Sequence, residues 1–252
     1  MDVRLCDVDK QFYLDYIDWL RSSCKTAWGK PVSPKTAHSY YTTLRTALNE
    51  AVRENLIASN PWYRLEMTEK IKVPESKRDF LTIEEIKRMM ATPFFNEQVR
   101  QAYLFSCFCG LRISDIRKLR WRDLSMSGGQ WRASVVMTKT IHPVYIPLSS
   151  QAVKWLPERG DCTPDGLVFG GLPNEGNLCV NLKNWAEKAG VKKNVTFHTA
   201  RHSCAVLLLT LGADIYTVSK ILGHRSVRST QVYAKIVDKK KDDAIALVDN
   251  AF

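Results

Sequence analysis

The chain lacks the features that would place it in a membrane or in a disulfide-bonded secreted class. No segment approaches the ~20 consecutive apolar residues that a membrane-spanning helix needs. The N-terminal residues MDVRLCDVDK are acidic and contain no apolar stretch of the kind found in a signal peptide. The seven cysteines form no C-x-x-C pair, so they give no support for a zinc ribbon or finger. We therefore expect reduced thiols in a cytoplasmic protein.

Acidic residues are outnumbered overall and absent from one long stretch. The 252 residues include 37 Lys and Arg against 26 Asp and Glu, which gives a formal net charge of +11. Such an excess favours a polyanionic partner, most often nucleic acid. Residues 21–49 contain no acid at all, so they either form a solvated face or face DNA phosphates. We expect the second, and the DNA-binding candidates are Arg21, Lys25, Lys30, Lys35 and Arg45.

Hydrophobic periodicity divides the chain into two parts. Residues 9–22 predict an amphipathic helix, and Ser33-Pro34 predicts the start of a second helix that runs to about residue 54. Residues 66–79 are charged, contain Pro74 and have little apolar periodicity. We expect a partial helical domain over residues 1–65, a linker over residues 66–79 and a second domain over residues 80–252.

The second part mixes helices with two short β-like runs. Thr82 followed by Glu85 predicts a capping box at the start of a helix over residues 83–91. Residues 96–109 predict an apolar helix that ends at Gly110. The runs 130–137 and 143–148 predict a hairpin or part of a small sheet. The expected fold class is mainly α with a small antiparallel β-sheet, and further helices are expected over about residues 149–156, 177–189, 199–211, 214–222, 227–235 and 239–248.

Five short motifs follow one another in the second part. The motifs are Gly110-Leu111-Arg112-Ile113-Ser114-Asp115, Thr138-Lys139-Thr140, His198-Thr199-Ala200-Arg201-His202, Leu222-Gly223-His224 and Tyr233. Each is unremarkable alone, but their order and spacing resemble those of the tyrosine recombinase, or phage integrase, family. The first part resembles, less specifically, the core-binding domain of integrases from Bacteroides-type mobile elements.

The residue types suit displacement at a phosphodiester. Negative charge spreads over the non-bridging oxygens in the transition state, and Arg112 and Arg201 offer permanently charged, planar forks of donors to them. A clamp of this kind works without a metal ion, and the sequence has no carboxylate cluster to hold two Mg²⁺. We expect no metal and no cofactor. Tyr233 supplies a hydroxyl for a covalent intermediate, which conserves bond energy so that rejoining needs no ATP.

The resemblance implies roles for the remaining motif residues. His198 assists proton transfer at the nucleophile, and His224 hydrogen-bonds a phosphate oxygen. Lys139 protonates the leaving 5′ oxygen. Asp115 braces the site through hydrogen bonds.

Three other features are expected to lie outside the chemistry. His202 is one position round the helix from Arg201, so we expect it to point elsewhere as a packing histidine. Tyr216 precedes His224 instead of following it, which does not match the position of the nucleophile in the family. The run Lys239-Lys240-Lys241 either touches DNA or ends a solvated helix.

The resemblance implies a site-specific DNA recombinase that cleaves and rejoins strands through a 3′-phosphotyrosine intermediate, to integrate or excise a mobile element. It implies double-stranded DNA with a specific recombination site as partner, a homotetramer on that DNA, accessory DNA-bending proteins, no membrane and a nucleoid-associated location. Two alternatives stay open: a type IB topoisomerase-like enzyme, and a non-catalytic DNA-binding protein of the same fold. Family members usually carry further N-terminal domains, so we expect a fragment, a truncated gene or a minimal variant.

Overall fold

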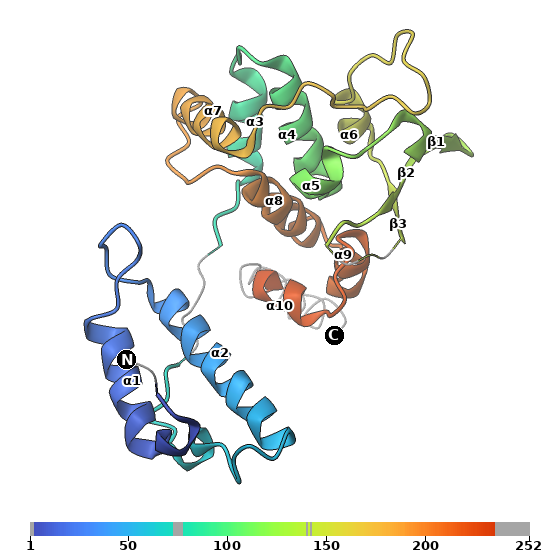
Figure 1. The fold of residues 1–252 in the computed structure, drawn as a ribbon. Coiled ribbons are helices and arrows are strands. Elements are labelled where there is room, and N and C mark those ends of the chain that lie inside the picture. Colours follow the sequence, from blue (N-terminus) through green and yellow to red (C-terminus); the bar gives the residue numbers. More distant parts are fainter. Residues whose placement is uncertain (1–2, 73–77, 140, 142, 235–252) are drawn as a thin grey trace, which may run out of the picture. The chain divides into compact units, whose positions relative to one another are not determined.

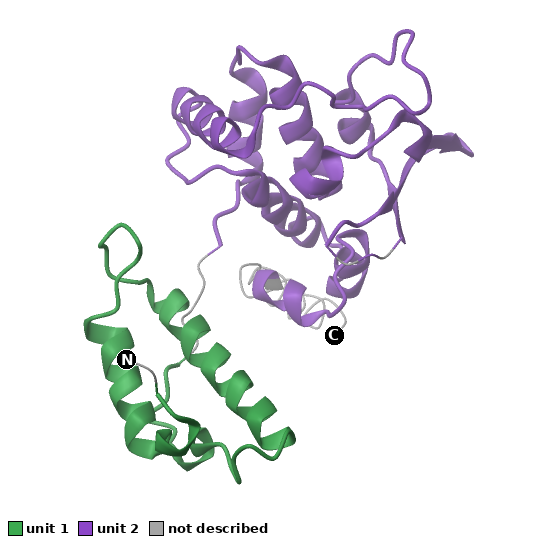
Figure 2. Ribbon diagram, viewed as in Figure 1, with its two compact units in different colours: residues 1–77 green, residues 78–252 purple. Residues whose placement is uncertain are grey.

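The computed structural model describes residues 3–72, 78–139, 141 and 143–234. The chain forms two compact units, residues 1–77 and 78–252 (Figure 2). The division falls inside the charged segment 66–79, which is the expected linker. Among the described residues, no helix is both long and apolar enough to cross a bilayer.

The first unit is a pair of helices closed by short 3₁₀ turns (Figure 1). The side chain of Asp9 accepts a hydrogen bond from the backbone N–H of Phe12, and Ser33 does the same for Thr36, with Pro34 in the first turn. These caps confirm the predicted helix starts. Apolar side chains from both helices form the core. The elements are η1 (Leu5–Asp7), α1 (Lys10–Ser22), α2 (Pro34–Arg53) and η2 (Pro61–Arg64).

The second unit is built around two buried helices, α4 (Glu97–Cys109) and α8 (Phe197–Thr210), which lie side by side. Most residues of α4 are buried on every side, as expected of a helix in the centre of a core. The predicted capping box of Thr82 and Glu85 is present at the start of α3. The other helical elements are α3 (Ile83–Ala91), α5 (Ile113–Ile116), η3 (Trp121–Asp123), α6 (Ser150–Lys154), α7 (Glu175–Lys188), α9 (Ile215–Ile221) and α10 (Arg228–Ala234).

A three-stranded antiparallel sheet lies beside these helices, in the order β1-β2-β3. Strands β2 (Gln130–Val136) and β3 (Pro143–Pro147) correspond to the two predicted runs. Strand β1 (Leu124–Ser127) was not predicted: its sequence LSMS alternates apolar and polar residues over only four positions, and of these Leu124 alone is buried. It pairs with β2 through a two-residue turn of Gly128 and Gly129, whose φ angles are 59° and 75°. The mainly helical fold class with a small sheet is confirmed.

Candidate active site

The first motif places Arg112 at the junction of two helices. Helix α4 ends at Gly110, whose φ of 73° is the left-handed conformation of a C-terminal cap. Arg112 then occupies the N-cap position of α5 and is half-buried. Its Nη1 lies 3.8 Å from Sδ of Met137, the residue that follows β2. The Arg112 side chain therefore points towards the turn between β2 and β3.

Arg201 lies on α8 and is almost fully buried, with 3% of its surface exposed. Its Nη1 donates to the carbonyl of Gly110 at 2.7 Å, and its Nη2 donates to the carbonyl of Leu222 at 2.5 Å. Burial and the charge of nearby Arg112 lower the pKa of Arg201 to about 10, so it stays charged at neutral pH. Because each terminal nitrogen carries two hydrogens, two more donors remain for an anion.

Asp115 anchors the turn that carries Lys139. The carboxylate is buried, and its Oδ1 accepts a hydrogen bond from the backbone N–H of Thr138 at 2.8 Å. Lys139 follows and is exposed. Two residues of this turn, Thr140 and His142, lie outside the described residues. Asp115 therefore ties the β2–β3 turn to α5, the helix whose N-cap position is Arg112.

Gly223 brings His224 against the same turn. Its φ is 61°, and a Cβ there would lie 2.9 Å from Cγ2 of Val144 and 3.1 Å from Cε of Met137. Since Arg112 also contacts Met137, that methionine lies between the first and fourth motifs. Burial, followed by the charges of Arg201 and Arg112, lowers the pKa of His224 to about 4. His224 is therefore a neutral ring beside two permanent cations.

Thr230 fixes the ring of His224. Its Oγ1 lies 2.8 Å from Nδ1 of His224, and Thr230 is fully buried on α10. A hydroxyl that donates to Nδ1 leaves the ring hydrogen on Nε2. That nitrogen is then the donor available to a phosphate oxygen. Sequence reasoning did not single out Thr230.

Tyr233 is 1% exposed, and its hydroxyl has two polar partners. The oxygen lies 2.5 Å from Nδ1 of His202 and accepts a hydrogen bond from Nη1 of Arg78 at 3.2 Å. The expectation that His202 points elsewhere is therefore wrong. His202 is four residues after His198, so the two share a helix face, and that spacing was the signal available in the sequence. Arg78 had no such signal, because it lies in the segment expected as a linker.

His198 takes a different position from the one its expected role suggests. It is exposed, and its ring centre lies 6.4 Å from that of His202. Of the two histidines, His202 is the one that touches the Tyr233 hydroxyl. The described residues contain no cluster of three or more His, Cys, Asp or Glu side chains arranged to hold a metal ion.

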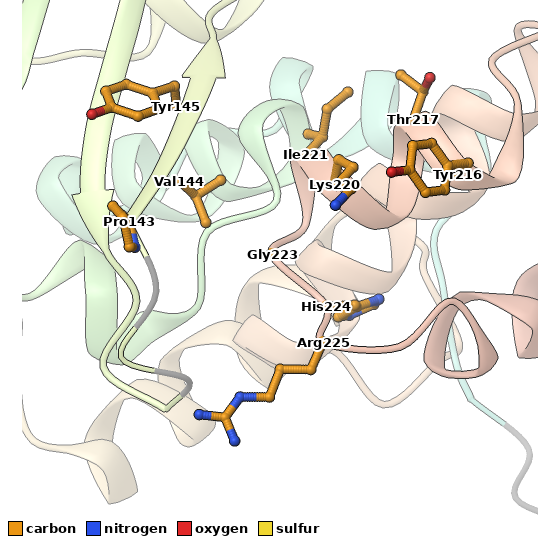
Figure 3. A pocket seen from close by; sticks show the side chains of 10 residues that line it. All are labelled: Pro143, Val144, Tyr145, Tyr216, Thr217, Lys220, Ile221, Gly223, His224 and Arg225. Atoms are coloured by element: carbon orange, nitrogen blue, oxygen red, sulfur yellow. The ribbon is translucent and has the colours of Figure 1, made fainter.

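A groove of about 850 Å³ opens beside His224. Tyr145 on β3 lies across it from Tyr216 and Lys220 on α9 (Figure 3). Both tyrosines are exposed, and Nζ of Lys220 lies 5.1 Å from the ring centre of Tyr216. The groove therefore combines aromatic faces with positive charge.

The basic residues of the first unit differ in their exposure. Arg21, Lys25, Lys30 and Lys35 are exposed. Arg45 is half-buried, with its guanidinium carbon 4.6 Å from the ring centre of Trp62. Arg45 therefore packs inside the unit, and the other four present their charges to solvent.

Comparison with known proteins gives matches over both units. Residues 79–240 match the phage integrase family, and residues 1–72 match the phage integrase SAM-like domain. A tyrosine recombinase of Pseudothermotoga lettingae is 30% identical, over 97% of this chain and 84% of the relative. The XerH site-specific recombinase bound to difH substrate has a TM-score of 0.68 at 19% identity, over 97% of this chain and 74% of that one. The Tn1549 transposon integrase bound to a circular intermediate DNA has a TM-score of 0.71 at 16% identity, over 92% of this chain and 82% of that one.

Proposed function

The chain belongs to the phage integrase family, and on this premise we propose that it is a site-specific DNA recombinase whose nucleophile is Tyr233. The observation that carries this proposal is the convergence of Arg112, Arg201, His224 and Tyr233 in the second unit. Arg201 hydrogen-bonds the carbonyls at the ends of α4 and α9. Arg112 and Gly223 both lie against Met137. Thr230 links His224 to α10, the helix of Tyr233. Contacts between different pairs of elements therefore hold these residues together.

The arginines form the electrostatic part of the site. Both stay charged at neutral pH, and a phosphodiester needs that charge where its non-bridging oxygens become more negative. His224 adds a neutral donor through Nε2. A low-dielectric surrounding strengthens these interactions, and the burial of Arg201 supplies it. Strand cleavage therefore proceeds without a metal ion or ATP.

Covalent bond formation follows from the hydroxyl of Tyr233. Its oxygen attacks phosphorus to give a 3′-phosphotyrosine link, and the bond to the 5′ oxygen breaks. Lys139, exposed on the β2–β3 turn, supplies the proton that the 5′ oxygen needs. Attack by a free 5′-hydroxyl reverses these steps and reseals a strand.

Contacts with the duplex extend beyond the scissile phosphate. In the first unit, four exposed cations bind DNA phosphates: Arg21, Lys25, Lys30 and Lys35. The groove beside His224 suits a DNA strand as well, because bases stack on aromatic faces and Lys220 donates to phosphate oxygens. We assign the core-binding role to residues 1–65 and the catalytic role to residues 80–252.

The assembly follows from the reaction. Exchange of two duplexes requires four cleavages, so four copies of the chain act on one junction, together with accessory proteins that bend the DNA. The event integrates or excises a mobile element. We place it in the cytoplasm at the nucleoid, where the DNA substrate lies.

A suicide substrate tests the chemistry. A recombination site is first selected by affinity capture of the DNA fragments that the chain binds from a fragment pool, and a nick is then placed so that the leaving piece is lost. The wild-type chain is expected to form a covalent adduct that resists denaturation. Tyr233→Phe is expected to form none and to bind the same duplex within about twofold of wild type, since only the hydroxyl is removed. Tyr216→Phe is the matched control and keeps the adduct.

Two results would contradict the proposal. Binding without any adduct in the wild-type chain would indicate a non-catalytic DNA-binding protein. Relaxation of a supercoiled plasmid, with no exchange between paired sites, would indicate a topoisomerase-like enzyme instead.

A further inference from the structure

The hydroxyl of Tyr233 is held between one group that only donates and one that can accept. Arg78 is permanently charged and has no acceptor, so its Nη1, 3.2 Å away, donates to a lone pair of the tyrosine oxygen. Its guanidinium carbon also lies 5.6 Å from the centre of the Tyr233 ring. In the tautomer with the His202 ring hydrogen on Nε2, the hydroxyl donates its own hydrogen to Nδ1 of His202, 2.5 Å away. A neutral imidazole with its hydrogen on Nε2 accepts that bond.

The surroundings keep His202 in that neutral form. Burial, followed by the charges of Arg78, His198 and Arg201, lowers the pKa of His202 to about 4. The groups that face it come from three places in the fold: Arg78 from the segment before α3, His198 and Arg201 from its own helix, and Tyr233 from α10. His224 is a further neighbour, because His202 contributes to the shift of its pKa. No carboxylate contributes to the shift of His202.

We propose that His202 is the general base of strand cleavage and that Arg78 is a positioning residue that aims the Tyr233 hydroxyl at it. As the tyrosine oxygen forms its bond to phosphorus, the hydroxyl proton moves to Nδ1 of His202 and the bond from phosphorus to the 5′ oxygen breaks. Lys139 supplies one proton to that oxygen. On resealing, the incoming 5′-hydroxyl returns a proton to Lys139, and His202 returns its own to the tyrosine. The inference rests on the proposed recombinase function and assigns the proton step within it.

The test measures single-turnover adduct formation between pH 6 and pH 8. The substrate is the captured suicide duplex with a sulfur atom in place of the scissile 5′ oxygen. A thiolate leaves without protonation, so Lys139 no longer affects the rate and the remaining pH dependence reports the tyrosine proton. Adduct formation by wild type and by Lys139→Ala on this duplex shows that the proposed function holds. If wild type forms no adduct, both the recombinase function and the role of His202 are overturned. If wild type forms the adduct, the dependence of the rate on pH in His202→Asn tests the role of His202 alone.

His202→Asn is the informative variant, because its Oδ1 accepts a hydrogen bond near the position of Nδ1 but does not take up a proton. Wild type is expected to react at a rate that changes less than about threefold over this range, since its base is neutral throughout. His202→Asn is expected to react about 100-fold more slowly at pH 7, and its rate should rise about tenfold per pH unit, because solvent must now remove the proton. His198→Asn is the matched control and keeps the flat profile.

Arg78 is tested in the same assay. Arg78→Ala is expected to slow the reaction about tenfold with the flat profile retained, and Arg78→Lys should recover part of the rate. Binding of each variant to the duplex is measured beside it, and unchanged binding shows a folded site. A flat profile in His202→Asn, a rate equal to or above wild type, or the sloping profile appearing in His198→Asn would each overturn the assignment.

Discussion

Thr230 is a single buried hydroxyl on which the orientation of His224 depends. Replacing it with Val removes the partner of Nδ1, so the ring loses the hydrogen bond that orients it. A buried hydrogen bond of this kind contributes about 1–2 kcal/mol, which corresponds to a loss of about tenfold in the rate of adduct formation. Rapid-quench measurement on the suicide duplex checks this value.

Two companion variants show whether the effect belongs to the ring. Thr230→Ser keeps the hydroxyl and is expected to recover most of the rate. Ser229→Ala removes an exposed hydroxyl from the same helix and should react as wild type. An unchanged rate in Thr230→Val would mean that His224 is held by other contacts.

At the scale of residues, the sequence predicts a site residue where a motif carries the information and gives no signal where only the fold does. The clamp arginines and the tyrosine are predicted because their types and order are distinctive. Arg78 was missed because its contact with Tyr233 joins positions 155 residues apart. His202 was misplaced because it was compared with its neighbour Arg201 and not with His198, one helical turn earlier.

Close approaches between helix ends set the geometry of the site. A Cβ at Gly110 would lie 2.5 Å from Cδ2 of Leu222, and the residue also has a positive φ. Gly110→Ala is therefore expected to destabilise the second unit by about 3 kcal/mol, from left-handed strain together with overpacking. Native-state hydrogen exchange of the amides of α4 and α8 measures this loss.

Gly160 provides the comparison for that variant. Its φ is 51°, and a Cβ there would meet nothing within 4 Å. Gly160→Ala should destabilise the same unit by about 1 kcal/mol, because only the backbone strain remains. Equal losses of unfolding free energy in the two variants would show that the close approach of Leu222, at the end of α9, adds nothing to the cost of a side chain at Gly110.

Local signals predicted most helix starts, since a cap is a short-range interaction. Ser33-Pro34, the Thr82–Glu85 box and the glycine at position 110 all occur where the sequence indicates them. Strand β1 was not foreseen, because the alternation in LSMS covers only four residues and the strand depends on its pairing with β2. The helix expected over residues 239–248, with Lys239-Lys240-Lys241, lies outside the described residues.

At the scale of the whole molecule, the excess positive charge predicts a steep dependence of DNA binding on salt. Lys25→Ala combined with Lys30→Ala is expected to make the plot of log affinity against log salt shallower by about 1.8, because each lost phosphate contact removes about 0.9. Fluorescence anisotropy over a range of salt concentrations measures the slope. Lys183→Ala is the control and should leave it unchanged, since the Lys183 charge lies 4.0 Å from that of Glu187.

Family and chemistry could be predicted from one sequence because five motifs in fixed order are hard to produce by chance. The sequence preferred for cleavage could not be predicted, since base contacts and DNA deformability are properties of the complex. The sequence also could not predict that Lys25 is exposed whereas Arg45 is half-buried, because the packing of Arg45 on Trp62 depends on the turn that follows α2.

The near-complete burial of Tyr233 affects how such an enzyme searches a genome. A protein with +11 net charge meets DNA often and without regard to sequence. A reactive group that is 1% exposed cannot reach a phosphate during those brief encounters. Cutting then depends on how long the protein stays at one place, because only a bound duplex supplies the free energy that opens a path for the phosphate to Tyr233 while its hydroxyl stays on His202. Concealment of the proposed nucleophile then protects the bulk of the chromosome from accidental nicks while the search goes on.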